Sequence, residues 1–312
     1  MTVPRAIGVA AAIAVVSALA AAPRVAGDYL IGVGLSLFTW VALTQSWAVF
    51  SGMSGYISLG HSVFYGIGAY VMVLTWRQVP LWAGGLLAGL ASGLFALAVG
   101  YPVLRVRGPY FVILTYGLAE LVKYMVINLE AALGKSSRLL FGAPGLEELY
   151  YVMLGLAAAA TALTAAVRAS RFGGGLRAIR EDEEAAETLG VPAAWTKALA
   201  FTLSAVVPGV VGAVMAMRLT YFQPLQVFSP ALSFTIVTMA IVGGSDRAPG
   251  PLLGVLFLGT ASELLWASTP EIYMILLGIL LIAFVLLAPD GIYGQILGRR
   301  GGKGPEPCSS SS

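Results

Sequence analysis

The chain has 312 residues, of which 58% are hydrophobic and 11% are charged, and its formal net charge is +3. Soluble globular domains carry about 25% charged residues, so this chain has too few to cover a surface that faces water. The composition therefore excludes a soluble globular protein, and the modest net charge gives no indication of a nucleic-acid partner.

Hydrophobic runs long enough to cross a bilayer follow one another along almost the whole chain. A spanning helix needs about 20 mostly apolar residues. This criterion gives candidate spans at 6–22, 29–50, 60–76, 81–103, 108–130, 147–169, 196–217, 230–244, 250–268 and 271–288. The third, eighth and ninth are short or interrupted by Gly and Pro, so we expect an all-α polytopic membrane protein with a bundle of about 8–10 helices.

The two ends of the chain differ from the bundle expected over about residues 5–295. The run 6–22 follows Arg5 and ends in small residues, so it resembles a secretory signal. We expect a retained first helix, with a cleavable signal as the alternative. The polar tail 296–312 holds the single cysteine, Cys308, so no disulfide framework is expected. We expect one transmembrane domain over the whole chain, 1–312.

Lysine and arginine predict the orientation, because they favour cytoplasmic loops. With a cytoplasmic N-terminus and ten spans, the inner loops hold Arg5, Arg105, Arg107, Arg168, Arg171, Arg177, Arg180, Lys197, Arg247, Arg299, Arg300 and Lys303. The outer side receives Arg24, Arg77, Lys123, Lys135, Arg138 and Arg218. This distribution predicts that both termini and the loop near residues 170–195 are cytoplasmic.

Residues 51–70, SGMSGYISLGHSVFYGIGAY, interrupt the hydrophobic pattern. Their glycines and serines break helix continuity between two spans, and broken membrane helices often border transport paths. His61 is the only histidine of the chain and lies here. A structural, hydrogen-bonded histidine is the alternative to a proton carrier. With one histidine and one cysteine, we expect no metal site.

The run 104–128, LRVRGPYFVILTYGLAELVKYMVIN, places two charges inside a span. Glu120 and Lys123 are three residues apart and therefore share a helical face. Charges at membrane depth usually face a bundle interior or a cavity and are functional candidates. A structural pair near the outer interface, with Lys123 reaching toward the headgroups, is the alternative.

The charged segment, residues 168–197, is the longest polar run between hydrophobic stretches. Residues 177–190, RAIREDEEAAETLG, predict an amphipathic helix that ends at Gly190, before Pro192. Ala178, Ala185, Ala186 and Leu189 are expected to share much of one face. We expect this helix to be a docking surface for another protein, and a solvated connector is the alternative.

These residues together resemble the M-type permease of branched-chain amino acid ABC importers. Four motifs occur in the family's order: GYISLGHSVFYGIGAY, LRVRGPYFVILTYGLAELVKYMVIN, RFGGGLRAIREDEEAAETLGVPAAWTKALAFTLSAVVPGVVGAV and a stretch ending in VGGSDRAPGPLLG. The resemblance covers residues 39–293. The chain departs from the family's pattern at Tyr56, Pro208 and residues 243–247, which puts the substrate in doubt more than the fold.

The resemblance implies a subunit of a bacterial inner-membrane importer without catalytic residues or cofactors of its own. Its implied partners are a second homologous permease, two cytoplasmic ABC ATPases, an extracytoplasmic (periplasmic) solute-binding protein and the lipid bilayer. The implied ATPase-coupling residues are Arg177, Ala178, Ile179, Arg180, Glu181, Ala185, Ala186, Leu189 and Gly190. The implied pathway residues are Ser58, His61, Tyr110, Thr115, Glu120 and Asn128.

Other functions stay open beside this one. Related permeases carry urea, short amides or other amino acids. A stand-alone secondary transporter or channel would need its own ion-coupling groups, and the spans hold few charges beyond Glu120, Lys123 and Glu263. An intramembrane enzyme would need a paired nucleophile and base, for which the residues are scarce.

Overall fold

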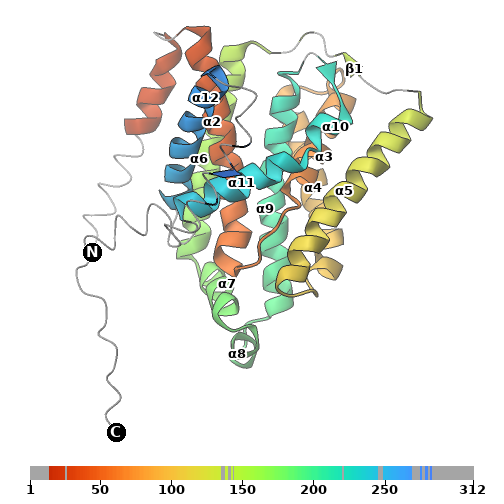
Figure 1. Ribbon diagram of the computed structural model, residues 1–312, viewed down its shortest axis with the longest axis vertical. Helices are drawn as coiled ribbons and strands as arrows, with labels where there is room; N and C mark the ends of the chain where they lie inside the picture. Colours follow the sequence, from red (N-terminus) through yellow and green to blue (C-terminus); the bar gives the residue numbers. More distant parts are fainter. Residues whose placement is uncertain are drawn as a thin grey trace.

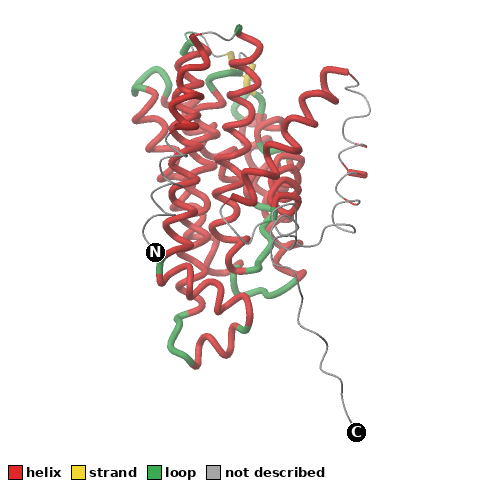
Figure 2. The backbone as a smooth tube through the Cα atoms, turned by 90° about the vertical axis from the view of Figure 1, so that its left-hand side faces the viewer, coloured by secondary structure: helices red, strands yellow, loops and turns green. Residues whose placement is uncertain are grey.

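The computed structural model describes residues 14–24, 27–134, 138–139, 142, 144–219, 221–244 and 249–268, together with 275, 278–279 and 282. Long helices run along the tall axis of the molecule, and the charged segment projects at one end (Figures 1 and 2). The end that carries the charged segment is called the segment end below, and the other is called the far end.

Helices make up nearly all of the described structure. In chain order the elements are η1 (Ala22–Arg24), α2 (Asp28–Trp47), the π-helical turn η2 (Ala48–Gly52), α3 (His61–Thr75), α4 (Leu81–Val103), α5 (Pro109–Ala132), β1 (Arg138–Leu139), α6 (Leu146–Ala169), α7 (Arg171–Glu181), α8 (Glu183–Thr188), α9 (Ala193–Ala216), β2 (Tyr221–Phe222), α10 (Pro224–Val227), α11 (Pro230–Gly243) and α12 (Pro249–Ser268). Proline begins α5, α10, α11 and α12, where its missing N–H costs no helical hydrogen bond.

The expected all-α membrane fold is confirmed. Within the described residues, six helices are long and apolar enough to cross a membrane, and 14–24 and α3 are shorter apolar helices. The expected runs from 29–50 to 250–268 coincide closely with helices, and the largest shift is at α9, which begins at Ala193. The span expected at 271–288 and the tail at 296–312 lie largely or wholly outside the described residues.

Helices α3, α4 and α9 form one tightly packed group. A Cβ atom on Gly68 of α3 would collide with the backbone of Gly209 in α9, and one on Gly212 would collide with the backbone carbonyl of Tyr65. A Cβ atom on Gly209 itself would meet Ser92 of α4. In a membrane, small residues of this kind let helix backbones approach, and close packing then stabilises the bundle.

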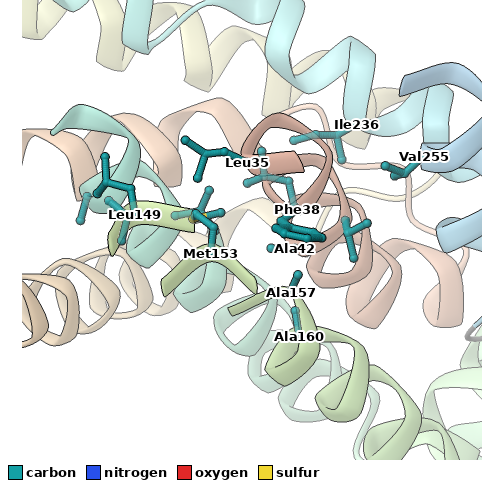
Figure 3. Close-up of a cluster of buried hydrophobic side chains, with 14 of the residues drawn as sticks. Leu35, Phe38, Ala42, Leu149, Met153, Ala157, Ala160, Ile236 and Val255 are labelled. Carbon is teal, nitrogen blue, oxygen red and sulfur yellow. The ribbon is translucent and has the colours of Figure 1, made fainter. Parts of the chain in front are cut away.

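A second packed region joins α2 to α6 and to the last described helices. Leu35, Phe38 and Ala42 of α2 point toward Leu149 and Met153 of α6, while Ile236 of α11 and Val255 of α12 close the cluster from the other side (Figure 3). The ring of Phe38 packs edge-on against that of Tyr150, with centroids 5.1 Å apart. These contacts make α2 a central helix, which explains its high burial.

A two-residue strand pair at the far end was not expected from the sequence. β1 pairs antiparallel with β2, with Arg138 opposite Phe222. Arg138 also forms an ion pair with Glu130 of α5 at 2.7 Å. The pairing connects the loop after α5 to the loop after α9.

Candidate functional site

The charged segment folds into two short helices that connect α6 to α9. Helices α7 and α8 meet at Asp182, whose backbone is extended. The Asp182 carboxylate accepts hydrogen bonds from the backbone N–H groups of Glu184, at 2.9 Å, and Ala185, at 3.0 Å. The expectation of one helix over 177–190 is therefore wrong, because Asp182 ends the first helix and caps the second.

The expected end of this region at Gly190 is confirmed. Gly190 has a φ of +88°, in the left-handed region that glycine adopts without strain. The N–H of Val191 donates to the carbonyl oxygen of Ala186 at 3.0 Å, and the N–H of Gly190 donates to that of Glu187 at 3.0 Å. This pair of bonds is the Schellman arrangement, so the glycine ends α8 and turns the chain toward α9.

The four residues expected to share a face of this segment do not share one environment. Ala186 is 2% exposed and packs with Ile179 and Ala193 inside the chain's own fold, whereas Leu189 is 84% exposed. Ala185 is exposed and Ala178 is half-buried. Of these four residues only Ala185 and Leu189 are exposed, and Leu189 lies beyond Thr188, the last residue of α8.

A cluster of polar side chains, called the Glu183 cluster (Tyr56, Arg107, Glu183 and Lys197), fastens α8 to the bundle. Lys197 Nζ donates to Glu183 Oε1 at 2.7 Å, and the Tyr56 hydroxyl donates to Glu183 Oε2 at 2.6 Å. Lys197 also donates to the Tyr56 hydroxyl at 3.3 Å and lies over its ring, 4.7 Å from the centroid. Arg107, between α4 and α5, reaches Glu183 at 3.5 Å. Four separate parts of the chain therefore meet at one carboxylate.

Burial and charge oppose each other at Glu183. Partial burial would raise the pKa of the Glu183 carboxyl, but the hydrogen bonds from Lys197 and Tyr56 and the charges of Lys197 and Arg107 lower it below its usual 4.5. Burial raises the pKa of the Tyr56 hydroxyl, and its hydrogen bond to Glu183 and the carboxylate charge raise it further. At neutral pH the carboxylate is thus charged and the hydroxyl keeps the proton that it donates.

The charged segment also holds the irregular stretch 53–60 directly. Arg180 of α7 donates from its guanidinium to the carbonyl oxygen of Gly52 at 3.3 Å. Its side-chain carbons lie so close to Gly55 that a Cβ atom there would be 3.0 Å from Arg180 Cγ. Gly55 has a φ of +76°, so it turns the chain at this contact. Arg180 and the Glu183 cluster thus hold this stretch at Gly55 and at Tyr56.

The other end of the same stretch begins a buried polar layer. Ser58 and His61 are each 0% exposed, and the Trp47 indole N–H donates to the Ser58 carbonyl oxygen at 2.9 Å. The Thr115 hydroxyl of α5 accepts from the N–H of Leu59 at 3.2 Å. Three of the predicted pathway residues, Ser58, His61 and Thr115, therefore come together. Both ring nitrogens of His61 are buried, and neither has a hydrogen-bond partner among the residues that the structure describes.

The remaining predicted pathway residues lie apart from this layer. Tyr110 is 73% exposed at the start of α5. Asn128 is exposed and donates to the carbonyl oxygen of Tyr124 one turn earlier, at 2.9 Å. Glu120 and Lys123 form the expected pair on one helical face, at 2.6 Å, with the lysine side chain 8% and the glutamate side chain 24% exposed. The sequence grouped these six residues, and the fold separates them into a buried layer and the face of α5.

Sequence reasoning missed the residues of the Glu183 cluster. Glu183 is one of several acids in a row, so its position alone does not distinguish it. Lys197 gave a usable signal, because a lysine just inside a span must find a partner. The cluster fixes the position of the charged segment against the loop before α3.

Comparison with known proteins agrees with this architecture. The family model described as "Branched-chain amino acid transport system / permease component" matches residues 29–285. The "High-affinity branched-chain amino acid transport system permease protein LivM" of Salmonella typhimurium (strain LT2) is 28% identical over 275 residues, which cover 77% of this chain and 64% of the relative. LivM of Escherichia coli (strain K12) is 27% identical over the same shares.

A second type of relative aligns over most of its own length. The "High-affinity branched-chain amino acid transport system permease protein LivH" of Escherichia coli (strain K12) is 26% identical over 286 residues, which cover 82% of this chain and 92% of the relative. In contrast, this chain spans only 64% of the length of the LivM relatives. No solved structure matches the chain. The match to the family model covers well over half of the residues, so the chain belongs to the family of permease components of branched-chain amino acid transport systems.

Proposed function

We propose that this chain is one of two permease subunits of an ATP-driven importer of branched-chain amino acids in the bacterial inner membrane. The observation that carries the proposal is the charged segment: two capped helices that project from the bundle and yet are fastened to it by the half-buried carboxylate of Glu183. A segment that only connected two spans would not need Glu183, Lys197 and Tyr56 to hold it in one position.

The proposal assigns separate parts to separate tasks. The exposed surface of α8, with Ala185, Leu189 and Gly190, contacts one of two cytoplasmic ATPases. The Glu183 cluster and Arg180 pass its displacement to the stretch 53–60. The polar layer with Ser58, His61 and Thr115 lies beside the path of the solute, which a solute-binding protein delivers at the far end. Both termini and the charged segment are then cytoplasmic, in agreement with the distribution of Lys and Arg.

The substrate class rests on the relatives. Both LivM and LivH are described as branched-chain amino acid permeases, and the family model carries the same description. Urea, short amides and other amino acids are the second candidates. A stand-alone secondary transporter is a less favoured function, because Glu120, Lys123 and Glu130 are among the few charges of the described spans and each is already in an ion pair.

Reconstituted transport tests the proposal. We expect the tagged chain to co-purify with a second permease and an ATPase, and the complex in proteoliposomes to take up radiolabelled leucine only when ATP and the solute-binding protein are present. A tenfold excess of unlabelled isoleucine or valine should suppress the signal, whereas urea should not. Uptake that is driven by a proton gradient, without ATP, would contradict the proposal.

Substitutions on α8 test the assignment of the ATPase contact. Ala185→Trp adds a large side chain to the exposed surface, so it should abolish ATP-driven uptake and co-purification of the ATPase while leaving the chain in the membrane. Leu133→Trp is the matched control, because Leu133 is 60% exposed at the far end. Equal effects of the two variants would show that α8 does not contact the ATPase.

A further inference from the structure

Helix α3 begins inside the bundle rather than at its surface. The N–H of Leu59, just before α3, donates to the hydroxyl of Thr115 at 3.2 Å. Thr115 is the seventh residue of α5, so this contact lies about 9 Å along α5 from its segment end. Helix α3 has 15 residues, fewer than each of the six candidate spans. At membrane depth, an irregular stretch such as 53–60 is tolerated only inside protein or beside a water-filled cavity.

The backbone around the start of α3 is held by neighbouring side chains. The N–H of Ser58 donates to the hydroxyl of Ser51 at 3.3 Å, and the N–H of Ser62 donates to that of Ser233, in α11, at 2.9 Å. The indole of Trp47 donates to the carbonyl oxygen of Ser58 at 2.9 Å. These backbone groups are therefore satisfied within the chain and need no other partner.

Two side chains in the first turn of α3 differ from this backbone. Both ring nitrogens of His61 and the hydroxyl oxygen of Ser62 are buried without a hydrogen-bond partner among the residues that the structure describes. Both residues are 0% exposed. A buried polar group without a hydrogen bond is unfavourable, and folded chains keep few of them. Three such atoms on two adjacent residues point to hydrogen bonds with a molecule from outside the chain.

The chemistry of this pair suits a carboxylate. In either protonation state at least one ring nitrogen of His61 carries an N–H donor, and the Ser62 hydroxyl offers a second donor. Both residues lie in the first turn of α3, where the positive end of the helix dipole favours negative charge. Broken membrane helices hold anionic groups of substrates in this way. The ring of Phe64, which is 1% exposed, lies 5.7 Å from that of His61 and adds an apolar neighbour.

We propose that His61 and Ser62 bind the carboxylate of the transported amino acid. The inference rests on the proposed function, in which the solute is an amino acid, and it adds the residues that recognise one of its groups. Because both side chains are fully buried here, the solute reaches them when α3 separates from a neighbouring helix. The hydroxyls of Thr115 in α5 and Ser233 in α11 hold two such borders, and polar groups of a solute can replace them.

Ligand-induced thermal stabilisation tests the proposal. The chain is purified in detergent together with the second permease, and its melting temperature is measured with millimolar leucine, isocaproate or leucinamide. Isocaproate lacks the ammonium group and leucinamide lacks the carboxylate. We expect leucine and isocaproate to raise the melting temperature and leucinamide to leave it unchanged.

Variants of the two residues locate the effect. A hydrogen bond to a charged group contributes about tenfold to affinity, so Ser62→Ala and His61→Leu should each raise the half-maximal leucine concentration by about that factor. His61→Gln keeps an N–H donor and should lose less than His61→Leu. Without ligand, Ser62→Ala should melt at the same temperature as the unmodified chain or higher, because it removes an unpaired hydroxyl. A purely structural hydroxyl would give the opposite result.

Tyr70→Phe is the matched control. The Tyr70 hydroxyl is also buried without a hydrogen-bond partner in the described part of the chain, but it lies farther along α3. Its ring packs against those of Phe222 and Phe228. We expect Tyr70→Phe to change the half-maximal leucine concentration less than twofold.

Several results would overturn the proposal. Absence of any stabilisation by leucine in the unmodified complex, or equal stabilisation by leucinamide, would exclude a carboxylate site. If Ser62→Ala and His61→Leu melt at lower temperature without ligand and keep the affinity for leucine, the two side chains instead hold a structural water molecule. These results leave the proposed function in place, which fails instead if the unmodified complex takes up no leucine with ATP and the solute-binding protein.

Discussion

Lys197 and Glu183 lie 2.7 Å apart across the junction between α9 and the charged segment, and the lysine side chain is 3% exposed. A lysine this deeply buried depends on its partner, because an unpaired charge in a protein interior is very unfavourable. The buried Lys197 of α9 therefore needs Glu183 beside it, and this need fixes the position of α8.

Removal of the carboxylate tests this dependence. Glu183→Gln leaves the Lys197 charge buried without its ion pair and should lower the free energy of unfolding by roughly 3 kcal/mol. Arg107→Gln should change it by no more than about 1 kcal/mol, because the Arg107 side chain is 56% exposed. Thermal unfolding in detergent measures both. The double variant Glu183→Gln/Lys197→Met should recover most of the loss, and failure to recover would show that the ion pair is not the cause.

The same carboxylate predicts a pH dependence. The pKa of Glu183 is lower in the folded chain than its usual 4.5, so its contribution to stability is complete above pH 4.5 and is lost as the pH falls through the lowered value. The pKa of Tyr56 is raised above its usual 10.0, so its contribution is complete below pH 10.0. The stability difference between the unmodified chain and Glu183→Gln should be constant from pH 5 to 9 and shrink below 4.5. A difference that changes near neutral pH would contradict this assignment.

The glycine contact between α3 and α9 predicts a steric effect. In Gly68→Ala the added Cβ would collide with the backbone of Gly209, which has no flexible side chain to move aside. We expect a loss of about 1–3 kcal/mol in the free energy of unfolding. Gly155→Ala in α6 is the control, because nothing lies within 4 Å of its added Cβ, and it should not destabilise the chain. Similar melting temperatures for the two variants would mean that α3 and α9 can separate at little cost.

The pair of Glu120 and Lys123 distinguishes a transport role from a structural one. Glu120→Gln removes the partner of a buried lysine, so it should lower both the amount of folded protein and the uptake of solute. Glu120→Gln/Lys123→Met removes both charges and should restore the folded protein, measured by size-exclusion chromatography. If uptake stays low in this double variant, the charges act on the solute or its path. Full recovery of uptake would show that the ion pair between Glu120 and Lys123 only stabilises the fold.

The sequence predicted the helices well because each span is a hydrophobic run of sufficient length between polar or Gly/Pro-rich breaks. The ends of α4, Leu81–Val103, coincide with the expected 81–103. Gly190 was predictable for a related reason, since a glycine before Val191 and Pro192 is typical of a helix end. These are local signals, and they need no knowledge of the neighbouring helices.

The candidate site depended on contacts that the sequence does not record. Asp182 could have been one more acid on a helix, and its role as a cap became visible only with the hydrogen bonds to Glu184 and Ala185. Leu189 was expected on a shared face with Ala186, but α8 ends at Thr188, so Leu189 follows the helix and is exposed while Ala186 is buried. The partnership of Tyr56 with Glu183 joins residues 127 positions apart, which no periodicity can predict.

The backbone contacts of Gly68 with Gly209 and of Gly212 with Tyr65 have a mechanical consequence. Because backbone touches backbone at these two points and the ring of Phe64 packs against that of Phe201, α3 and α9 cannot slide or rotate past each other without losing these contacts. We therefore expect the two helices to move as one rigid body. Helix α9 holds Lys197 near its start, beside α8, and α3 begins at His61, in the buried polar layer. A push on the charged segment would tilt both helices together, so any opening for a solute must form at the borders of this pair and not between its two members.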